Sequence, residues 1–375
     1  MSQSIMMDKF PSEWQVMQIG DLFEAKAGGD YDPSNSSDVR DNRYPYPIYA
    51  NGLTQQGLYG FSNYSEEPSG SITVTGRGTL GQAFYRDTPF VAIGRLIVLK
   101  PKTSINARFF CEYINYGIEF AVESTGVPQL TAPQISNYLV PVPLIPEQRA
   151  IAEVLSDVDG LLNALEALIA KKRAIKQATM QQLLTGKARL PGFSGAWETK
   201  RLGDVAHIKT GSKNNEDKDD NGQYPLYVRS AVVERINSYC FDGEAILVPG
   251  EGGIENIFHY INGRFDCHQR VYMINRFVDD VFGKLIYYIM VLQFGRHAMQ
   301  NTVKATVDSL RLPTCQTFTF SIPKDVVEQR AITTVLSDMD AEIAALEQRR
   351  DKTRAIKQGM MQQLLTGRVR LVKPK

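Results

Sequence analysis

Two stretches of the chain carry apolar residues spaced alternately four and three positions apart, the heptad pattern of a long amphipathic helix. In the first stretch these positions are Ile151, Leu155, Val158, Leu162, Leu165 and Ile169. No proline lies between Glu147 and Leu190, while Pro146 precedes the stretch and Gly186 lies near its end. Proline favours a helix start and glycine a helix end. The pattern predicts about 38 residues of helix, roughly 55 Å long.

The same stretch occurs twice. Glu147–Leu190 is repeated at Glu328–Leu371, 181 positions further on (328 − 147), with 28 of 44 paired residues identical. A repeat of this length indicates a duplicated structural unit. A lone helix with one apolar stripe needs a partner, so each copy is expected to pack on the other. Because a long segment separates them, they can pair antiparallel, which would relate the two halves by a pseudo-twofold axis.

A second apolar column runs beside the first in the first copy. Its members, seven residues apart, are Val154, Leu161, Leu168 and Ile175. The two columns together form a stripe wide enough to contact more than one partner. In the second copy this column is weaker, because Glu342 and Arg349 interrupt it. The first column is predicted to pair the helices and the second to bind another protein, unless the second also packs within the chain.

The segments before the two helices share a frame. WQVMQIGD at 14–21 matches WETKRLGD at 197–204, and YPIY at 46–49 matches YPLY at 224–227. Each segment then enters a glycine loop, ITVTGRGTLG at 72–81 and ILVPGEGGI at 246–254. A strand pattern follows, RLIVLK at 95–100 and RVYMI at 270–274, and then a helix near 106–120 and 279–295.

Short strands with one or two helices indicate an α+β fold. We predict two small α/β domains at 1–146 and 191–327, separated by two long antiparallel coiled-coil helices at 147–190 and 328–375. Net charge is −4, +2, −1 and +4 for residues 1–146, 147–190, 191–327 and 328–375, so the basic residues are concentrated in the helical repeats. A shared frame with divergent loops is expected of two recognition modules of different specificity.

Composition narrows the class of protein. The chain has no run of 18 apolar residues and no apolar leader at its start, so neither a transmembrane helix nor a signal peptide is expected. Its four cysteines are scattered and form no disulfide framework, which suits a reducing cytoplasm.

The sequence offers little support for a catalytic, cofactor or metal site. Residues 76–81, GRGTLG, match the dinucleotide-binding fingerprint, but the strand-like AFYRDTPF follows where that fingerprint needs a helix. The four histidines have no metal-ligand spacing, and no P-loop occurs. We therefore expect no catalytic residue, metal or cofactor in this chain, and a nucleotide-dependent enzyme built on GRGTLG is a distant alternative.

Together these motifs resemble the specificity (S) subunit of type I restriction–modification systems. The resemblance rests on the paired WxxxxIGD and WxxxxLGD starts, the YPxY segments, and EQRAI, LSD, IKQ and MQQLLTG in both repeats. The second copy departs from the first in lacking the PLIP that precedes the first EQR.

The resemblance implies a non-catalytic subunit with two target recognition domains, each reading one half of a bipartite site on double-stranded DNA. It also implies two methyltransferase (M) subunits docked on the helices, with restriction (R) subunits completing the enzyme. S-adenosylmethionine, ATP and Mg²⁺ are then expected on those partners. A coiled-coil scaffold that binds no DNA is the alternative.

DNA contacts are expected from polar side chains in the loops. Arginine or lysine reads guanine, asparagine or glutamine reads adenine, and serine and threonine join them at phosphates. The first module offers Arg43, Asn51, Thr75, Arg77 at the tip of the glycine loop, Thr125 and Gln129. The second module offers Lys213, Arg229, Ser230, Gln269, Arg270, Asn301, Lys304 and Thr306.

Overall fold

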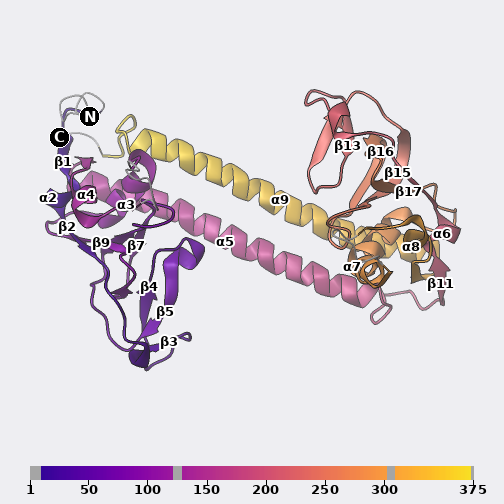
Figure 1. Cartoon of the computed structure of the whole chain (residues 1–375), viewed down its shortest axis with the longest axis horizontal. Helices are drawn as coiled ribbons and strands as arrows, with labels where there is room; N and C mark the ends of the chain where they lie inside the picture. The colour runs from indigo at the N-terminus through magenta and orange to yellow at the C-terminus, as the bar shows by residue number, and fades with distance from the viewer. Residues whose placement is uncertain (1–9, 121–128, 302–308, 373–375) are drawn as a thin grey trace. The chain divides into compact units, whose positions relative to one another are not determined.

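The chain divides into two compact units in the computed structural model (Figure 1). Unit 1 comprises Met1–Glu166 and Gln348–Lys375, and unit 2 comprises Ala167–Glu347. The structure describes residues 10–120, 129–301 and 309–372. Three candidates for DNA contact, Thr125, Lys304 and Thr306, lie outside the described residues.

Two helices of 39 residues each correspond to the repeats. They are α5 (Ile145–Leu183) and α9 (Val326–Leu364). Gly186 and Gly367 follow them with φ of +68° and +70°, the left-handed conformation that glycine adopts at helix ends. Each helix contributes one half to each unit. The compact units therefore cut across the helices, whereas the prediction from sequence treated each helix as a separate segment.

The two helices run antiparallel within each unit. In unit 1, Glu147, Asp159 and Glu166 of α5 pair with Arg370, Lys357 and Arg354 respectively, so residue numbers rise along one helix as they fall along the other. In unit 2 the repeat-related residues pair in exchanged roles: Arg189 with Glu328, Lys176 with Asp340 and Arg173 with Glu347. The predicted antiparallel pairing is confirmed within each unit, and the same three ion pairs recur because the repeats are equivalent.

Most of the first apolar column of α5 is buried: Ile151, Leu155, Leu165 and Ile169 are buried, and Val158 and Leu162 are half-buried. Ile151 and Leu155 are fully buried in the core of unit 1, together with Leu364 and Leu365 from the end of the second repeat. In unit 2 the core includes Ile332 and Leu336 of α9. Heptad spacing thus predicted the buried face of the long helices correctly.

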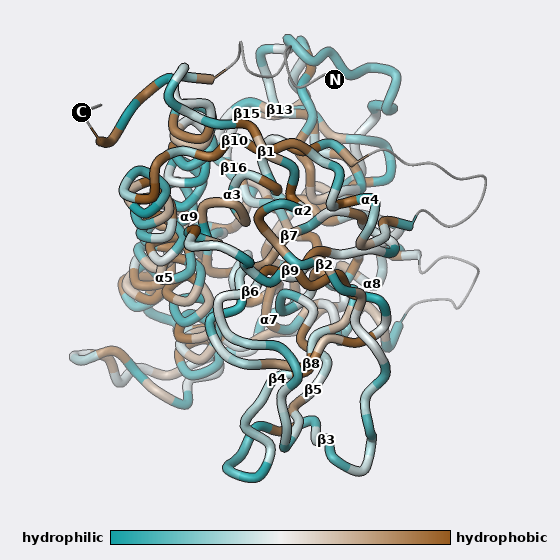
Figure 2. The backbone as a smooth tube through the Cα atoms, turned by 90° about the vertical axis from the view of Figure 1, so that its left-hand side faces the viewer, coloured by the Kyte–Doolittle hydropathy of each residue, from teal (hydrophilic) through white to brown (hydrophobic). Residues whose placement is uncertain are grey.

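The first module contains two four-stranded sheets. One has the order β2 (Phe23–Ala27), β9 (Ile97–Pro101), β6 (Ser71–Val74), β7 (Ala83–Arg86), and the other β3 (Ser36–Ser37), β5 (Leu58–Ser62), β4 (Tyr46–Tyr49), β8 (Val91–Ala92). A strand pair, β1 (Gln15–Gln18) with β10 (Leu139–Val142), joins its start to its end. Helix α3 (Ala107–Gly117) packs its apolar face on the first sheet. In Figure 2, β9 carries the brown of hydrophobic residues, whereas the loop beside β3 is mostly teal.

The second module has one six-stranded sheet. Its order is β12 (His207–Thr210), β17 (Val271–Asn275), β15 (Phe241–Pro249), β16 (His259–Cys267), β13 (Tyr224–Tyr227), β14 (Val233–Ile236). The pair β11 (Trp197–Arg201) with β18 (Thr319–Pro323) matches β1 with β10, and α7 (Gly283–Asn301) packs on the sheet as α3 does. The predicted α+β class and both predicted module helices are confirmed.

The Glu-Gln pair that opens each repeat fastens the module to the helices. The buried Glu147 carboxylate accepts hydrogen bonds from Trp14 Nε1 at 3.0 Å and Arg370 Nη2 at 2.8 Å. The equally buried Glu328 accepts two from Arg189, at 2.6 and 2.7 Å. These buried carboxylates join residues that are distant in the sequence, which gives the repeated motif a structural role.

The adjacent glutamines make a second fastening. Gln148 Oε1 accepts a hydrogen bond from the backbone N of Asn106 at 2.8 Å, and Gln329 Oε1 accepts one from the backbone N of Phe282 at 2.8 Å. Each glutamine also donates to the carbonyl of a proline just before its helix, Pro143 or Pro323. The same glutamine therefore attaches each module to its long helix, whereas only Glu147 also bonds the tryptophan of its module, because Trp197 Nε1 is buried without a hydrogen-bond partner among the described residues.

Replacing Glu147 with alanine is expected to lower the free energy of unfolding by about 3 kcal/mol, because it leaves the buried Trp14 Nε1 without its acceptor and leaves Arg370 with only its pairing to Glu13. Urea unfolding of the full chain, followed by Trp14 fluorescence, measures this loss. The chain has two tryptophans, so a Trp197→Phe background assigns the signal to unit 1.

The matched control is Glu166→Ala. Glu166 pairs with Arg354, and both side chains are about half exposed, 54% and 50%. Such exposed pairs contribute less than about 1 kcal/mol. Equal losses for the two alanine variants would show that the buried carboxylate does not fasten the module.

Candidate nucleic-acid interface

In the second module, loops that are far apart in the sequence are joined by backbone hydrogen bonds. Gln269 N donates to Lys213 O at 2.8 Å, and Gly250 N donates to Arg270 O at 2.7 Å. His268 N donates to Tyr227 O at 2.9 Å, which brings in the loop that contains Arg229. We call these segments the second loop cluster: residues 211–214, 227–230, 250–254, 268–270 and 309–310. This cluster brings together five of the residues predicted to contact DNA: Lys213, Arg229, Ser230, Gln269 and Arg270.

The first module has the equivalent arrangement. Ile93 N donates to Tyr49 O at 2.9 Å, and Leu130 N donates to Gly76 O at 2.9 Å. Asn51 joins two loops, since its Nδ2 donates to Gly94 O and its Oδ1 accepts from Gly76 N at 2.8 Å. The first loop cluster is defined as residues 28–29, 49–51, 75–81, 92–95 and 129–130.

The first glycine of each glycine loop is required by close packing. A Cβ at Gly76 would lie 2.8 Å from Leu130 O and 3.1 Å from Arg95 O, and a Cβ at Gly250 would lie 2.9 Å from Arg270 O. In the first module the loop leads into strand β7, so no helix N-terminus is available to hold a pyrophosphate. The first glycine of the GxGxxG match therefore packs against the backbone of neighbouring loops.

The predicted contacts of the first module have different surroundings. Arg77 is exposed and forms an isolated β-bridge with Gln129, which is also exposed. Thr75 is buried, and its hydroxyl donates to Thr79 O and accepts from Gln82 N. The structure thus gives Thr75 and the doubly bonded Asn51 a loop-supporting position, and their role as DNA contacts stays a prediction.

Two predicted residues lie apart from the loop clusters. Arg43 is exposed before β4, with its guanidinium 5.3 Å from the centre of the Tyr44 ring. Asn301 is the last residue of α7, and its Nδ2 donates to His297 O at 2.8 Å. Neither residue therefore belongs to a loop cluster.

Within the second loop cluster, several predicted side chains already have partners. Ser230 Oγ donates to Val232 O at 3.1 Å, and Gln269 Nε2 donates to Asn214 Oδ1 at 2.5 Å. Arg229 and Arg270 both pair with Glu251. These partners hold the side chains in place on exposed loops.

Two residues of these loops were missed by the sequence reasoning. Arg95 is exposed, with a φ of +64°, two residues before β9, and Arg270 lies directly before β17. Aligning RLIVLK with RVYMI shows this correspondence. Glu251 occupies the position of Arg77 when GRG is aligned with GEG, and a search confined to basic, amide and hydroxyl side chains passed over it.

The two loop clusters differ in how their charged side chains are paired. Within the described part of the chain, Arg77 and Arg95 form no ion pair, so the first cluster presents two uncompensated guanidinium groups. In the second cluster the Arg270 guanidinium beside Glu251 lowers the pKa of that carboxyl, which therefore stays ionised at neutral pH. The same loop frame thus carries different recognition chemistry in each module.

The second apolar column of α5 is largely exposed. Leu161, Leu168 and Ile175 have relative exposures of 40%, 38% and 42%. Val154 differs, because it is half-buried against the core of unit 1. Three members of the predicted partner-binding column are therefore accessible.

A family model described as the type I restriction modification DNA specificity domain matches residues 11–177 and 195–354, one module and most of one long helix each time. The chain belongs to this family. The crystal structure of a type I restriction-modification S subunit from M. genitalium has the same fold, with a TM-score of 0.73, 15% identity, and coverage of 94% of this chain and 96% of that one.

Relatives by sequence are specificity subunits. A type I specificity subunit of Mycoplasma pneumoniae is 31% identical over 143 residues, a match that spans 38% of this chain and 39% of that protein. The type I restriction enzyme MjaVIII specificity subunit of Methanocaldococcus jannaschii is 21% identical over 411 aligned positions, covering 97% of this chain and 94% of its own length. The described helices include none that is long and apolar enough to cross a membrane.

Proposed function

We propose that this chain is the DNA-recognition subunit of a type I restriction–modification enzyme. Each module reads one half of a bipartite site on double-stranded DNA through its loop cluster. The observation that carries the proposal is the shared loop frame with different exposed charges, Arg77 and Arg95 in the first cluster against Arg229, Glu251 and Arg270 in the second. A common frame with different readers suits a site whose two halves differ.

The chain supplies recognition and assembly, and its partners supply chemistry. Two modification subunits dock on the long helices and carry S-adenosylmethionine, and restriction subunits carry the ATP- and Mg²⁺-dependent cleavage activity. The exposed column at Leu161, Leu168 and Ile175 supports docking, because an apolar column on a surface helix marks an interaction site.

A gel-shift competition tests DNA recognition against the scaffold alternative. The full chain, assembled with its modification subunit, is mixed with a labelled genomic fragment and a large excess of random duplex. Recognition predicts that some fragments stay bound. If the complex assembles but prefers no fragment, the chain is a scaffold whose modules do not read DNA.

A further inference from the structure

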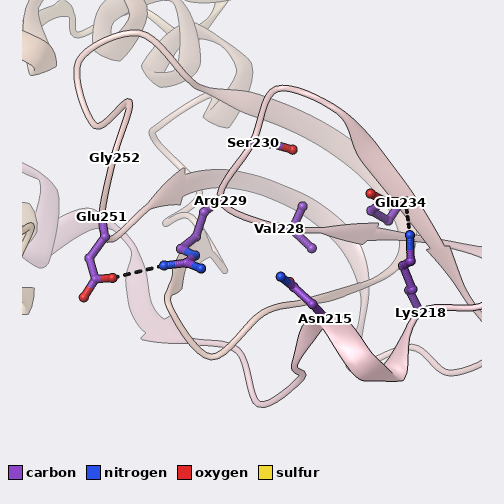
Figure 3. A pocket seen from close by; sticks show the side chains of 8 residues that line it. All are labelled: Asn215, Lys218, Val228, Arg229, Ser230, Glu234, Glu251 and Gly252. Atoms are coloured by element: carbon purple, nitrogen blue, oxygen red, sulfur yellow. Dashed lines mark hydrogen bonds and ion pairs between the residues drawn. The ribbon is translucent and has the colours of Figure 1, made fainter. Parts of the chain in front are cut away.

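Three loops of the second module meet at one carboxylate. Arg229 Nη1 lies 3.2 Å from Glu251 Oε2, and Arg270 Nη1 lies 2.5 Å from Oε1 of the same side chain. Arg229 follows β13, Glu251 follows β15, and Arg270 precedes β17. Arg229 and Glu251 also line a cleft of about 500 Å³ together with Asn215, Lys218 and Glu234 (Figure 3).

Stability does not account for this arrangement. The exposed fractions of the Arg229, Glu251 and Arg270 side chains are 43%, 26% and 54%. Exposed ion pairs contribute little to stability, and holding two long arginines in one geometry costs side-chain entropy. A rigid guanidinium is, however, the group best suited to guanine or phosphate, so the order imposed here is useful for recognition.

The carboxylate also changes the electrostatics of the surface. Two arginines without a partner attract any duplex, because phosphate attraction is independent of sequence. A glutamate between them offsets that attraction and repels phosphates that approach it directly. In the first module Arg77 stands at the equivalent position, so this compensation belongs to the second module.

We infer that Glu251 is the positioning residue that sets the specificity of the second module. It holds Arg229 and Arg270 in the geometry that its half-site accepts, and it offsets their charge toward non-cognate DNA. This inference rests on the proposed function. Under this inference, Glu251 controls discrimination at the second half-site and has no effect on the first.

The Glu251→Gln variant keeps the shape of the side chain and removes its charge. Its affinity for random duplex is expected to rise, and its salt dependence to steepen by up to about two log units per log unit of salt, since each added phosphate contact contributes about 0.9. Discrimination against changes in the second half-site is expected to fall about tenfold or more, because the arginines lose their fixed geometry. Discrimination at the first half-site stays unchanged.

The control is Asp242→Asn, which removes the same charge from the same module. Asp242 pairs with Arg264 at 2.9 Å, with both side chains about half exposed, in β15 rather than in the loop cluster. A second variant, Arg270→Gln, should also lose second-half-site discrimination but should weaken binding to random duplex. Net charge alone would move random-duplex binding in opposite directions, but it would not make both variants lose second-half-site discrimination, so that shared loss is what identifies positioning.

Binding constants are measured at several salt concentrations for the full chain assembled with its modification subunit, on its own site and on duplexes altered in either half. If Glu251→Gln behaves like Asp242→Asn while the wild-type complex distinguishes both half-sites, the inference is overturned and the proposed function stands. If the wild-type complex distinguishes neither half-site, both are overturned.

Discussion

Replacing Leu168 with glutamate is expected to weaken binding of the modification subunit about 10- to 100-fold without lowering the melting temperature of the chain. Leu168 lies in the exposed column of α5, with 38% of its surface accessible. Burying a leucine side chain in an interface contributes about 1.5–3 kcal/mol, and a charge placed there also opposes desolvation. Co-purification and circular dichroism melts measure the two effects.

The next residue along the helix provides the control. Ile169 is only 3% exposed, so Ile169→Glu should place a charge in a buried position and abolish the cooperative melting transition. If Leu168→Glu also collapses the melt, the column belongs to the core. If it leaves both the melt and assembly unchanged, the modification subunit docks elsewhere.

Exchanging residues 1–146 for the equivalent segment of a relative is expected to change one half of the DNA site completely and leave the other half intact. The exchange keeps Glu147 and Gln148, which fasten the first module to the helices. The donor segment must therefore carry a tryptophan in the place of Trp14. Sequencing of methylated bases in a host that carries the hybrid system reads both halves at once. A change in both halves, or in neither, would contradict independent reading.

Local spacing was enough to predict the long helices. Ile151 and Leu155 lie in the buried column that the heptads predicted, and the glycines after LLT end both helices. The antiparallel pairing followed from the repeat, because neither stripe could be buried alone. What spacing could not show is that buried Glu147 meets Arg370, since that contact joins residues 223 positions apart in the sequence.

The loops were less predictable, because long-range hydrogen bonds decide which side chains face outward. Thr75 reads as an ordinary polar loop residue, yet closure of the glycine loop buries it and bonds its hydroxyl internally. Asn51 is likewise held between Gly94 and Gly76. Arg95 and Glu251 could have been found by aligning the modules on each other, which compares positions rather than residue types.

The central claim is that the two modules read two separate halves of one DNA site. Sequencing of methylated bases in a host carrying the unaltered system tests this most directly, because methylation records the recognised sequence. We predict one asymmetric motif made of two specified blocks with an unspecified spacer between them. A single contiguous motif, or assembly with modification subunits but no motif at all, would contradict the account.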